Sequence, residues 1–327
     1  MKLRTLALMG GFLAAASLSA QTTLTDVINE FNTGVENINS QEYELALEHF
    51  NQVISLADEV GAEADEMKAN AQSQIPATYY RQATVFMKRK QYDNAIPYLE
   101  KTVESAAQFG NNEEIAGKAQ GYLPPLYVRE GNAAWKNQNQ DAALEYFDKA
   151  LSMNEALYQA HQGKGLVFFD KGEIDMMLQE FDLAKKGALA ENDDKTISAI
   201  NDVINSHYNG RIQSEFDQVD EEEADYTYVI EACEKALEAN AENPRAYYYM
   251  AMINNKNIEF DAAIQNAEKA LQFESDPVWT SAINYELGLA YSNTAEYEKA
   301  CETLQKVMEE PFLSRAEKKL ETVPGCN

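Results

Sequence analysis

The sequence predicts an all-α protein built from repeated pairs of antiparallel helices. Residues that interrupt helices are scarce, because only 8 of the 327 residues are Pro and 15 are Gly. Hydrophobic residues make up 45% of the chain, which is enough for an extended core. A short pattern of bulky and small residues also recurs along the chain with the spacing of a helix.

The recurring pattern begins with a bulky residue and continues with an Ala three places later. A large apolar residue follows four places after the Ala, and a small or apolar residue three places after that. These intervals put all four residues on one face of a helix. Seven copies have these residues in the place of the Ala: Ala46, Ala95, Ala143, Met177, Val229, Ala263 and Ala300.

A second amphipathic helix precedes each copy. Twelve places before the Ala position, most copies have a residue small enough for the paired helices to cross at short range. These residues are Gly34, Ala83, Gly131, Gly165, Ala251 and Gly288. The unit is therefore a helix pair, with the small residue of the first helix facing the second.

This arrangement resembles the tetratricopeptide repeat, a helix–turn–helix unit of about 34 residues. The last unit matches best, with the family's favoured residue types at Leu287, Gly288, Tyr291, Tyr297, Ala300 and Leu304. The resemblance covers residues 21–310, or about seven units. It implies a right-handed superhelical solenoid of antiparallel helix pairs, whose first helices line a concave face.

Units two and three are longer than the standard repeat. The spacings from Ala46 to Ala95 and from Ala95 to Ala143 both contain an insert, and Pro76 and Pro124 lie at equivalent places in it. We expect lengthened first helices that bend at these prolines, because proline removes one backbone donor. The matched pair resembles an elaboration of exported bacterial repeat proteins.

Two further segments complete the predicted domain. The long interval from Met177 to Val229, which contains Lys195–Val219 and then an acidic run, predicts a long helix pair with Gly210 at the crossing point. Residues 311–327 predict a C-terminal capping helix and tail, because a solenoid's last repeat otherwise exposes its apolar face.

Residues 1–20 have the layout of a secretory signal peptide. Lys2 and Arg4 precede the uncharged apolar run Leu6–Ala16, and the small residues Ser19 and Ala20 follow it. The run is too short to span a bilayer comfortably. We therefore expect an exported protein, periplasmic or envelope-associated, that is soluble and has no transmembrane anchor once the leader is removed.

The formal net charge of −27 argues against a nucleic-acid partner. It suits a basic partner or simply maintains solubility. The three cysteines form no CxxC motif, so neither a zinc site nor a redox motif is indicated. In an oxidising compartment, Cys301 and Cys326 could form a bridge that holds the C-terminal tail, or stay apart.

No catalytic or metal site is predicted, and no cofactor. The only histidines, His49, His161 and His207, fall in different units and have no metal-ligand spacing. No Ser/His/Asp or Cys/His arrangement can be proposed either. The full Lys/Asn clamp with which some tetratricopeptide proteins grip C-terminal carboxylates is also not found.

The resemblance places ligand contacts on the concave side of the first helices. Aromatic faces there would supply buried area, while Asn and Lys would hold a backbone or a carboxylate. An alternative is that many of these rings only pack against the neighbouring unit. The candidate groove residues are Tyr80, Met87, Lys88, Asn132, Trp135, Lys136, Phe169, Tyr248, Met252, Asn255, Lys256 and Tyr285.

The function that follows is a non-catalytic scaffold of the bacterial envelope, which binds a protein or peptide of unknown identity in its concave groove. Two alternatives remain open. One is an enzyme or accessory subunit that acts on envelope components, and the other is a self-assembling structural protein.

Overall fold

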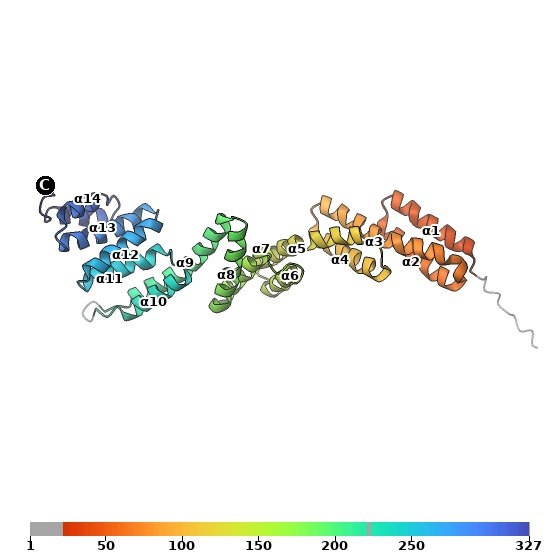
Figure 1. Cartoon of the computed structure of the whole chain (residues 1–327), viewed down its shortest axis with the longest axis horizontal. Coiled ribbons are helices and arrows are strands. Elements are labelled where there is room, and N and C mark those ends of the chain that lie inside the picture. Colours follow the sequence, from red (N-terminus) through yellow and green to blue (C-terminus); the bar gives the residue numbers. More distant parts are fainter. Residues whose placement is uncertain (1–21, 221–223, 327) are drawn as a thin grey trace, which may run out of the picture. The chain divides into compact units, whose positions relative to one another are not determined.

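The computed structural model describes residues 22–220 and 224–326, which form α-helices and one short 3-10 helix, with no strand in these ranges (Figure 1). The predicted signal peptide lies outside the described residues. The chain divides into two compact units, one that ends at Glu155 and one that begins at Ala156. Each unit is an all-α stack of helix pairs, so the predicted fold class is confirmed.

The first unit contains three helix pairs. Its elements are α1 (Leu24–Asn39), α2 (Tyr43–Val60), the 3-10 helix η1 (Ala62–Ala64), α3 (Asp65–Lys88), α4 (Tyr92–Phe109), α5 (Glu113–Lys136) and α6 (Gln140–Met153). The pairs are α1 with α2, α3 with α4, and α5 with α6. Both α3 and α5 have 24 residues and continue through Pro76 and Pro124, so the predicted lengthening of these first helices is confirmed.

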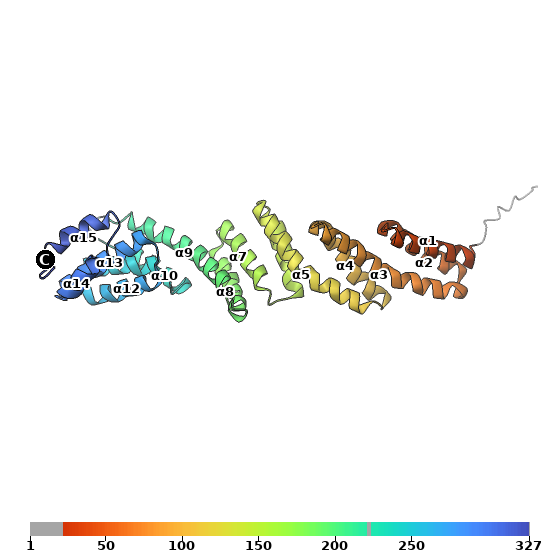
Figure 2. The same ribbon diagram turned by 90° about the horizontal axis from the view of Figure 1, so that it is seen from above.

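The second unit contains four helix pairs and a terminal helix (Figure 2). Its elements are α7 (Tyr158–Lys171), α8 (Ile174–Ala190), α9 (Asp194–Phe216), α10 (Thr227–Ala239), α11 (Pro244–Lys256), α12 (Phe260–Phe273), α13 (Pro277–Asn293), α14 (Tyr297–Leu304) and α15 (Phe312–Leu320). Helix α15 packs on α13 and α14.

First helices also contact the first helix of the next pair. In the first unit α1 meets α3 and α3 meets α5, and in the second unit α9 meets α11 and α11 meets α13. The second helices of successive pairs are farther apart than the first helices are. The first helices therefore form the inner side of each unit. This side is where a groove is expected.

The small residues of the first helices do mark the close crossings. A Cβ atom added to Gly34 would lie 2.8 Å from the ring of Phe50, and one added to Gly131 would lie 2.7 Å from the ring of Phe147. The same addition at Gly288 would come within 2.6 Å of Leu304. Each partner is the large apolar residue of the sequence pattern, which confirms the predicted pairing.

The role predicted for Gly210 is wrong. Nothing lies within 4 Å of the position that its Cβ would occupy. The buried face of α9 carries Ile204, Tyr208 and Ile212 instead, and Gly210 lies on another side of the helix. The long interval between Met177 and Val229 leaves the register of this repeat undefined in the sequence.

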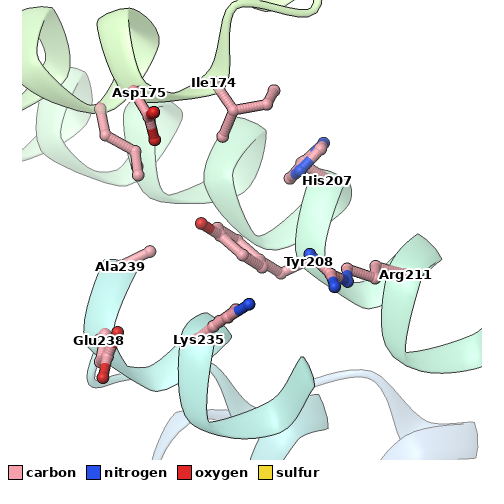
Figure 3. A pocket seen from close by; sticks show the side chains of 9 residues that line it. Ile174, Asp175, His207, Tyr208, Arg211, Lys235, Glu238 and Ala239 are labelled. Carbon is pink, nitrogen blue, oxygen red and sulfur yellow. The ribbon is translucent and has the colours of Figure 1, made fainter. Parts of the chain in front are cut away.

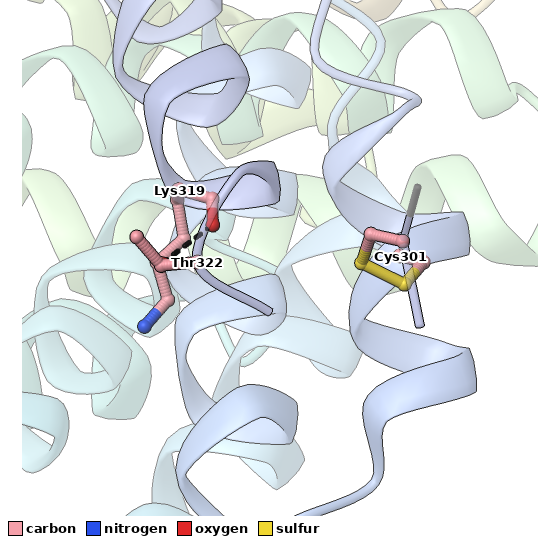
Figure 4. The surroundings of a disulfide bond; sticks show 4 residues. Cys301, Lys319 and Thr322 are labelled. Atoms are coloured by element: carbon pink, nitrogen blue, oxygen red, sulfur yellow. Dashed lines mark hydrogen bonds between the residues drawn. A yellow bond between two sulfur atoms is a disulfide. The ribbon is translucent and has the colours of Figure 1, made fainter. Parts of the chain in front are cut away.

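Cys301 and Cys326 form a disulfide with their Cα atoms 5.3 Å apart (Figure 4). The bond joins α14 to the chain beyond α15 and so encloses the terminal helix. Ala316 and Val323 are buried at the same end of the unit.

No helix of the described part of the chain combines the length and the apolar character needed to cross a bilayer.

Gly131→Val is expected to lower the free energy of unfolding by about 1–3 kcal/mol, because the branched side chain must displace the buried Phe147 ring. Gly117→Val on the same helix is the matched control, since nothing lies within 4 Å of its Cβ position. Urea unfolding of both variants beside the wild type measures the difference. Equal losses in the two variants would contradict the crossing assignment.

Reduction of the disulfide is expected to lower stability by about 3 kcal/mol, because a loop of this length then regains its freedom in the unfolded chain. Amide hydrogen exchange in α15 should accelerate as well. The readout is the melting temperature with and without reductant. A Cys301→Ser, Cys326→Ser double variant should no longer respond to reductant. If the melting temperature of the wild type also does not change with reductant, the bond contributes nothing to stability.

Candidate partner-binding surface

A polar cleft lies along the first helices of the second unit. It encloses about 490 Å³ between α9, the start of α11 and the α12–α13 connection. A smaller hollow of about 220 Å³ adjoins it at Arg245 and Asn209, where Tyr249 and Trp279 form part of the lining. The two hollows together are called the first-helix cleft below.

One wall of the first-helix cleft is a row of asparagines on α9. Asn201, Asn205 and Asn209 are spaced four residues apart, which places them one above another on the same side of the helix. Asn240 donates from Nδ2 to Oδ1 of Asn205 at 2.9 Å, and Asn243 donates to Oδ1 of Asn209 at 3.0 Å. These bonds fix the orientation of the two amide groups on α9.

The same bonds leave donors free. Within residues 22–220 and 224–326, no acceptor takes a hydrogen bond from Nδ2 of Asn205 or Asn209. Both side chains are half-buried and line the first-helix cleft. Two oriented amide donors therefore face a hollow that an acceptor could enter.

Arg245 lies where the two hollows meet. Its guanidinium carbon stands 3.6 Å from the ring centre of Trp279, and its Nε atom lies 3.7 Å from a carboxylate oxygen of Glu274. Burial lowers the pKa of Arg245, while Glu274 and Asp276 act in the opposite direction. The stacked and paired guanidinium is held in one position and stays charged.

Glu286 is a buried carboxylate at the α11–α13 contact. It is 8% exposed and accepts a hydrogen bond of 2.8 Å from Nδ2 of Asn255, which also donates to the backbone oxygen of Glu286 at 2.9 Å. Burial raises the pKa of Glu286, and the Asn255 hydrogen bond and the charges of Lys256 and Arg315 only partly offset it. The pair ties α11 to α13.

The candidate residues of the second unit fall into two places. Tyr248, Asn255, Lys256 and Tyr285 surround Glu286. Met252 is half-buried on α11. Phe169 lies elsewhere, on α7, with its ring edge-on to His207 at 6.4 Å.

Several of these side chains are engaged in packing. Tyr248 is 7% exposed, and its ring lies 5.4 Å from Trp279. Tyr285 packs against Phe312 of α15 at 6.1 Å, and the ammonium of Lys256 lies 5.7 Å above the Tyr226 ring.

The candidates of the first unit lie on α3 and α5. Tyr80 is half-buried near Tyr122 of α5, and burial raises the pKa of Tyr80. The others occupy the C-terminal halves of the two helices: Met87, Asn132 and Trp135 are half-buried, and Lys88 and Lys136 are exposed.

The best-defined polar features were not among the sequence candidates. The row Asn201, Asn205 and Asn209 has a visible signal, since a polar amide recurs every four residues on one helix. Glu286 has no such signal, because a glutamate in a helix is ordinarily solvated. No group of His, Cys, Asp or Glu within the described ranges is arranged to hold a metal ion.

Stacked antiparallel helix pairs with close small-to-large crossings define a helical repeat protein. Three segments match the family model described as tetratricopeptide repeat, at residues 76–109, 124–157 and 281–310. The chain therefore contains tetratricopeptide repeats at these residues. Among curated protein sequences, none matches it.

Several solved structures are similar at low sequence identity. One is the TPR2AB domain of yeast Sti1, described as a complex with pHSP90, with 17% identity, a TM-score of 0.38, and coverage of 91% of this chain and 97% of that chain. Another is the C-terminal part of a TPR repeat-containing protein from Cytophaga hutchinsonii, with 15% identity, a TM-score of 0.37, and coverage of 87% and 98%. Pseudomonas aeruginosa pilF has 13% identity, a TM-score of 0.32, and coverage of 77% and 98%.

Glu286→Gln is expected to stabilise the protein, and more so at higher pH. Because burial raises the folded-state pKa of Glu286 above its unfolded value, the folded chain binds the extra proton between these two pKa values, and stability falls as pH rises through that window. The variant lacks this titration. Thermal unfolding from about pH 4.5 to pH 8 measures the gap between variant and wild type.

Glu317→Gln, an exposed change on α15, is the control and should show no such trend. A gap for Glu286→Gln that stays constant with pH would contradict a raised pKa.

Proposed function

We propose that this protein is a non-catalytic scaffold that binds a protein partner through an extended segment laid along the first-helix cleft. The observation that carries the proposal is the pair of unused amide donors on Asn205 and Asn209, held in place by Asn240 and Asn243. Their geometry is already fixed, so little side-chain entropy would be lost on binding.

The spacing of these donors suits an extended chain. Residues four apart on a helix are separated by about 6 Å along its axis. Carbonyl groups that point to the same side of an extended strand recur every second residue, or about 6.6 Å. Asn205 and Asn209 can therefore donate to two successive same-side carbonyls of a partner that runs along α9.

Arg245 and Trp279 extend the site beyond the asparagines. Their stacked pair offers a flat face and a fixed cation at the junction of the two hollows. Arginine and tryptophan are the residue types that contribute most at protein interfaces. A side chain or carboxylate of the partner would dock here while its backbone follows the asparagines.

The strongly shifted groups support a structural role rather than catalysis. Cys233 is fully buried, and burial raises its pKa to about 12, so its thiol is a poor nucleophile. Glu286 is engaged by Asn255 at a helix contact. We also propose that the scaffold acts in the bacterial envelope, on the leader-like residues 1–20 of the sequence alone.

The test is selection of linear peptides from a displayed library on the whole protein, followed by fluorescence anisotropy with the selected peptides. Asn205→Asp, Asn209→Asp is the informative variant, because aspartate still accepts from Asn240 and Asn243 but cannot donate. We expect binding to weaken about thirtyfold, since two donors are lost and two carboxylates face the partner's carbonyls.

Asn192→Asp, Asn257→Asp adds the same charge at exposed turn residues of the same unit and is the matched control. It should bind as the wild type does. Peptides that bind both double variants equally would place the partner outside the first-helix cleft, and failure to select any peptide would argue against a peptide-binding scaffold.

A further inference from the structure

A second polar cleft lies between α8, α9 and α10 and shares no lining residue with the first-helix cleft. It encloses about 450 Å³, a size typical of small-ligand sites. Its walls come from the first turn of α8, the middle of α9 and the end of α10 (Figure 3). This α8–α10 cleft is not used by the proposed scaffold function.

Tyr208 forms the floor of the α8–α10 cleft. The residue is 7% exposed, and its ring lies edge-on to the His207 ring at 5.0 Å. Its hydroxyl points into the cleft in Figure 3, and no hydrogen bond joins it to any part of the chain that the structure describes. Burial raises the pKa of Tyr208, so the hydroxyl keeps its proton and can donate.

Two cations occupy one end of the cleft. Figure 3 shows the Lys235 ammonium pointing toward Arg211, near the backbone end of the Tyr208 side chain. Across the described ranges, neither cation has a carboxylate within 4 Å, although the chain has 54 acidic residues and 27 basic ones. Two like charges that face one another are stabilised when an anion lies between them.

Two carboxylates line the remainder of the cleft. Asp175 of α8 lies toward the hydroxyl end of Tyr208 in Figure 3, and Glu238 of α10 lies one turn from Lys235. Neither forms an ion pair with a described residue, and both raise the pKa of Tyr208. The cleft therefore has two unpaired cations at one end and two unpaired carboxylates along the rest of its lining.

The order of the groups selects the ligand. In Figure 3 the Tyr208 side chain lies between the cations and Asp175, and its hydroxyl points into the cleft. A ligand that meets both charged ends therefore needs a hydrogen-bond acceptor between its own charges. In a free amino acid the ammonium and the carboxylate share one carbon, with no acceptor between them, whereas a dipeptide has an amide carbonyl there.

We propose that the α8–α10 cleft binds free dipeptides. The ligand carboxylate lies at Arg211 and Lys235, its ammonium lies at Asp175, and its central carbonyl accepts a hydrogen bond from Tyr208. Each charged end of such a zwitterion meets a group of opposite sign that lacks a partner of its own.

The test is isothermal titration of the full mature chain with Ala-Ala, Ala-Glu and Ala-Lys. At least one of them should bind. Free alanine, the N-acetyl dipeptide and the dipeptide amide should each bind at least about tenfold more weakly, because each lacks either the central amide or one charge. Failure of all three dipeptides at millimolar concentration, or equal binding of the capped forms, would overturn the proposal.

Two variants locate the site. Arg211→Gln and Tyr208→Phe should each weaken dipeptide binding about tenfold, and Tyr208→Phe keeps the buried ring. Lys318→Gln removes a cation and Tyr228→Phe removes a hydroxyl at exposed residues of the same unit, and both should have no effect. Unchanged affinity for dipeptides in Arg211→Gln and Tyr208→Phe would overturn the proposal.

The two proposed binding sites can be tested independently of each other. Asn205→Asp, Asn209→Asp should leave dipeptide binding intact, and Arg211→Gln should leave binding of library-selected peptides intact. Loss of dipeptide binding in the asparagine variant would move the dipeptide site to the first-helix cleft and so overturn this inference.

Discussion

The close crossing of two helices within each pair is the contact on which the rest of the structure depends. Where Gly34, Gly131 or Gly288 lies on the first helix, the second helix supplies Phe50, Phe147 or Leu304 to the space that a side chain would have filled. Protein interiors are close-packed, so such a contact has one well-defined geometry. Each crossing sets the angle of its pair, and the next pair then packs on a surface that is already fixed.

One consequence is that one side of a first helix packs against its neighbours while another side is free to line a cleft. On α9, Ile204 and Ile212 are buried against neighbouring helices, while Asn205 and Asn209 face the first-helix cleft. The two asparagines serve both stability and binding, because their oxygens accept from Asn240 and Asn243 whereas their nitrogens stay free. A stabilising contact thus also fixes the orientation of the donors that a partner would meet.

The sequence was sufficient for the fold because steric requirements appear directly as residue size at fixed intervals. The pairing of Gly131 with Phe147 follows from that pattern, and no knowledge of the rest of the chain is needed. The pattern failed at Gly210, where a longer interval left the register undefined. It also could not show how far Tyr248 is buried by Trp279, since this contact joins residues of different pairs. The sequence carries no signal for the buried Glu286, because burial of a carboxylate depends on its neighbours and not on local spacing.

The acidic character of the chain gives particular weight to cations that line a cleft without a carboxylate partner. Some lysines lie beside a carboxylate one turn away, such as Lys149 with Glu145 and Lys186 with Asp182. Arg245 is likewise paired with Glu274 and stacked on Trp279, which makes it a fixed element of the first-helix cleft. A carboxylate in solution is repelled by most of such a surface and is attracted where cations lie close together without a carboxylate partner. In the second unit, Arg211 and Lys235 provide such a place, so the overall negative charge favours the α8–α10 cleft as the point at which a small acidic group approaches.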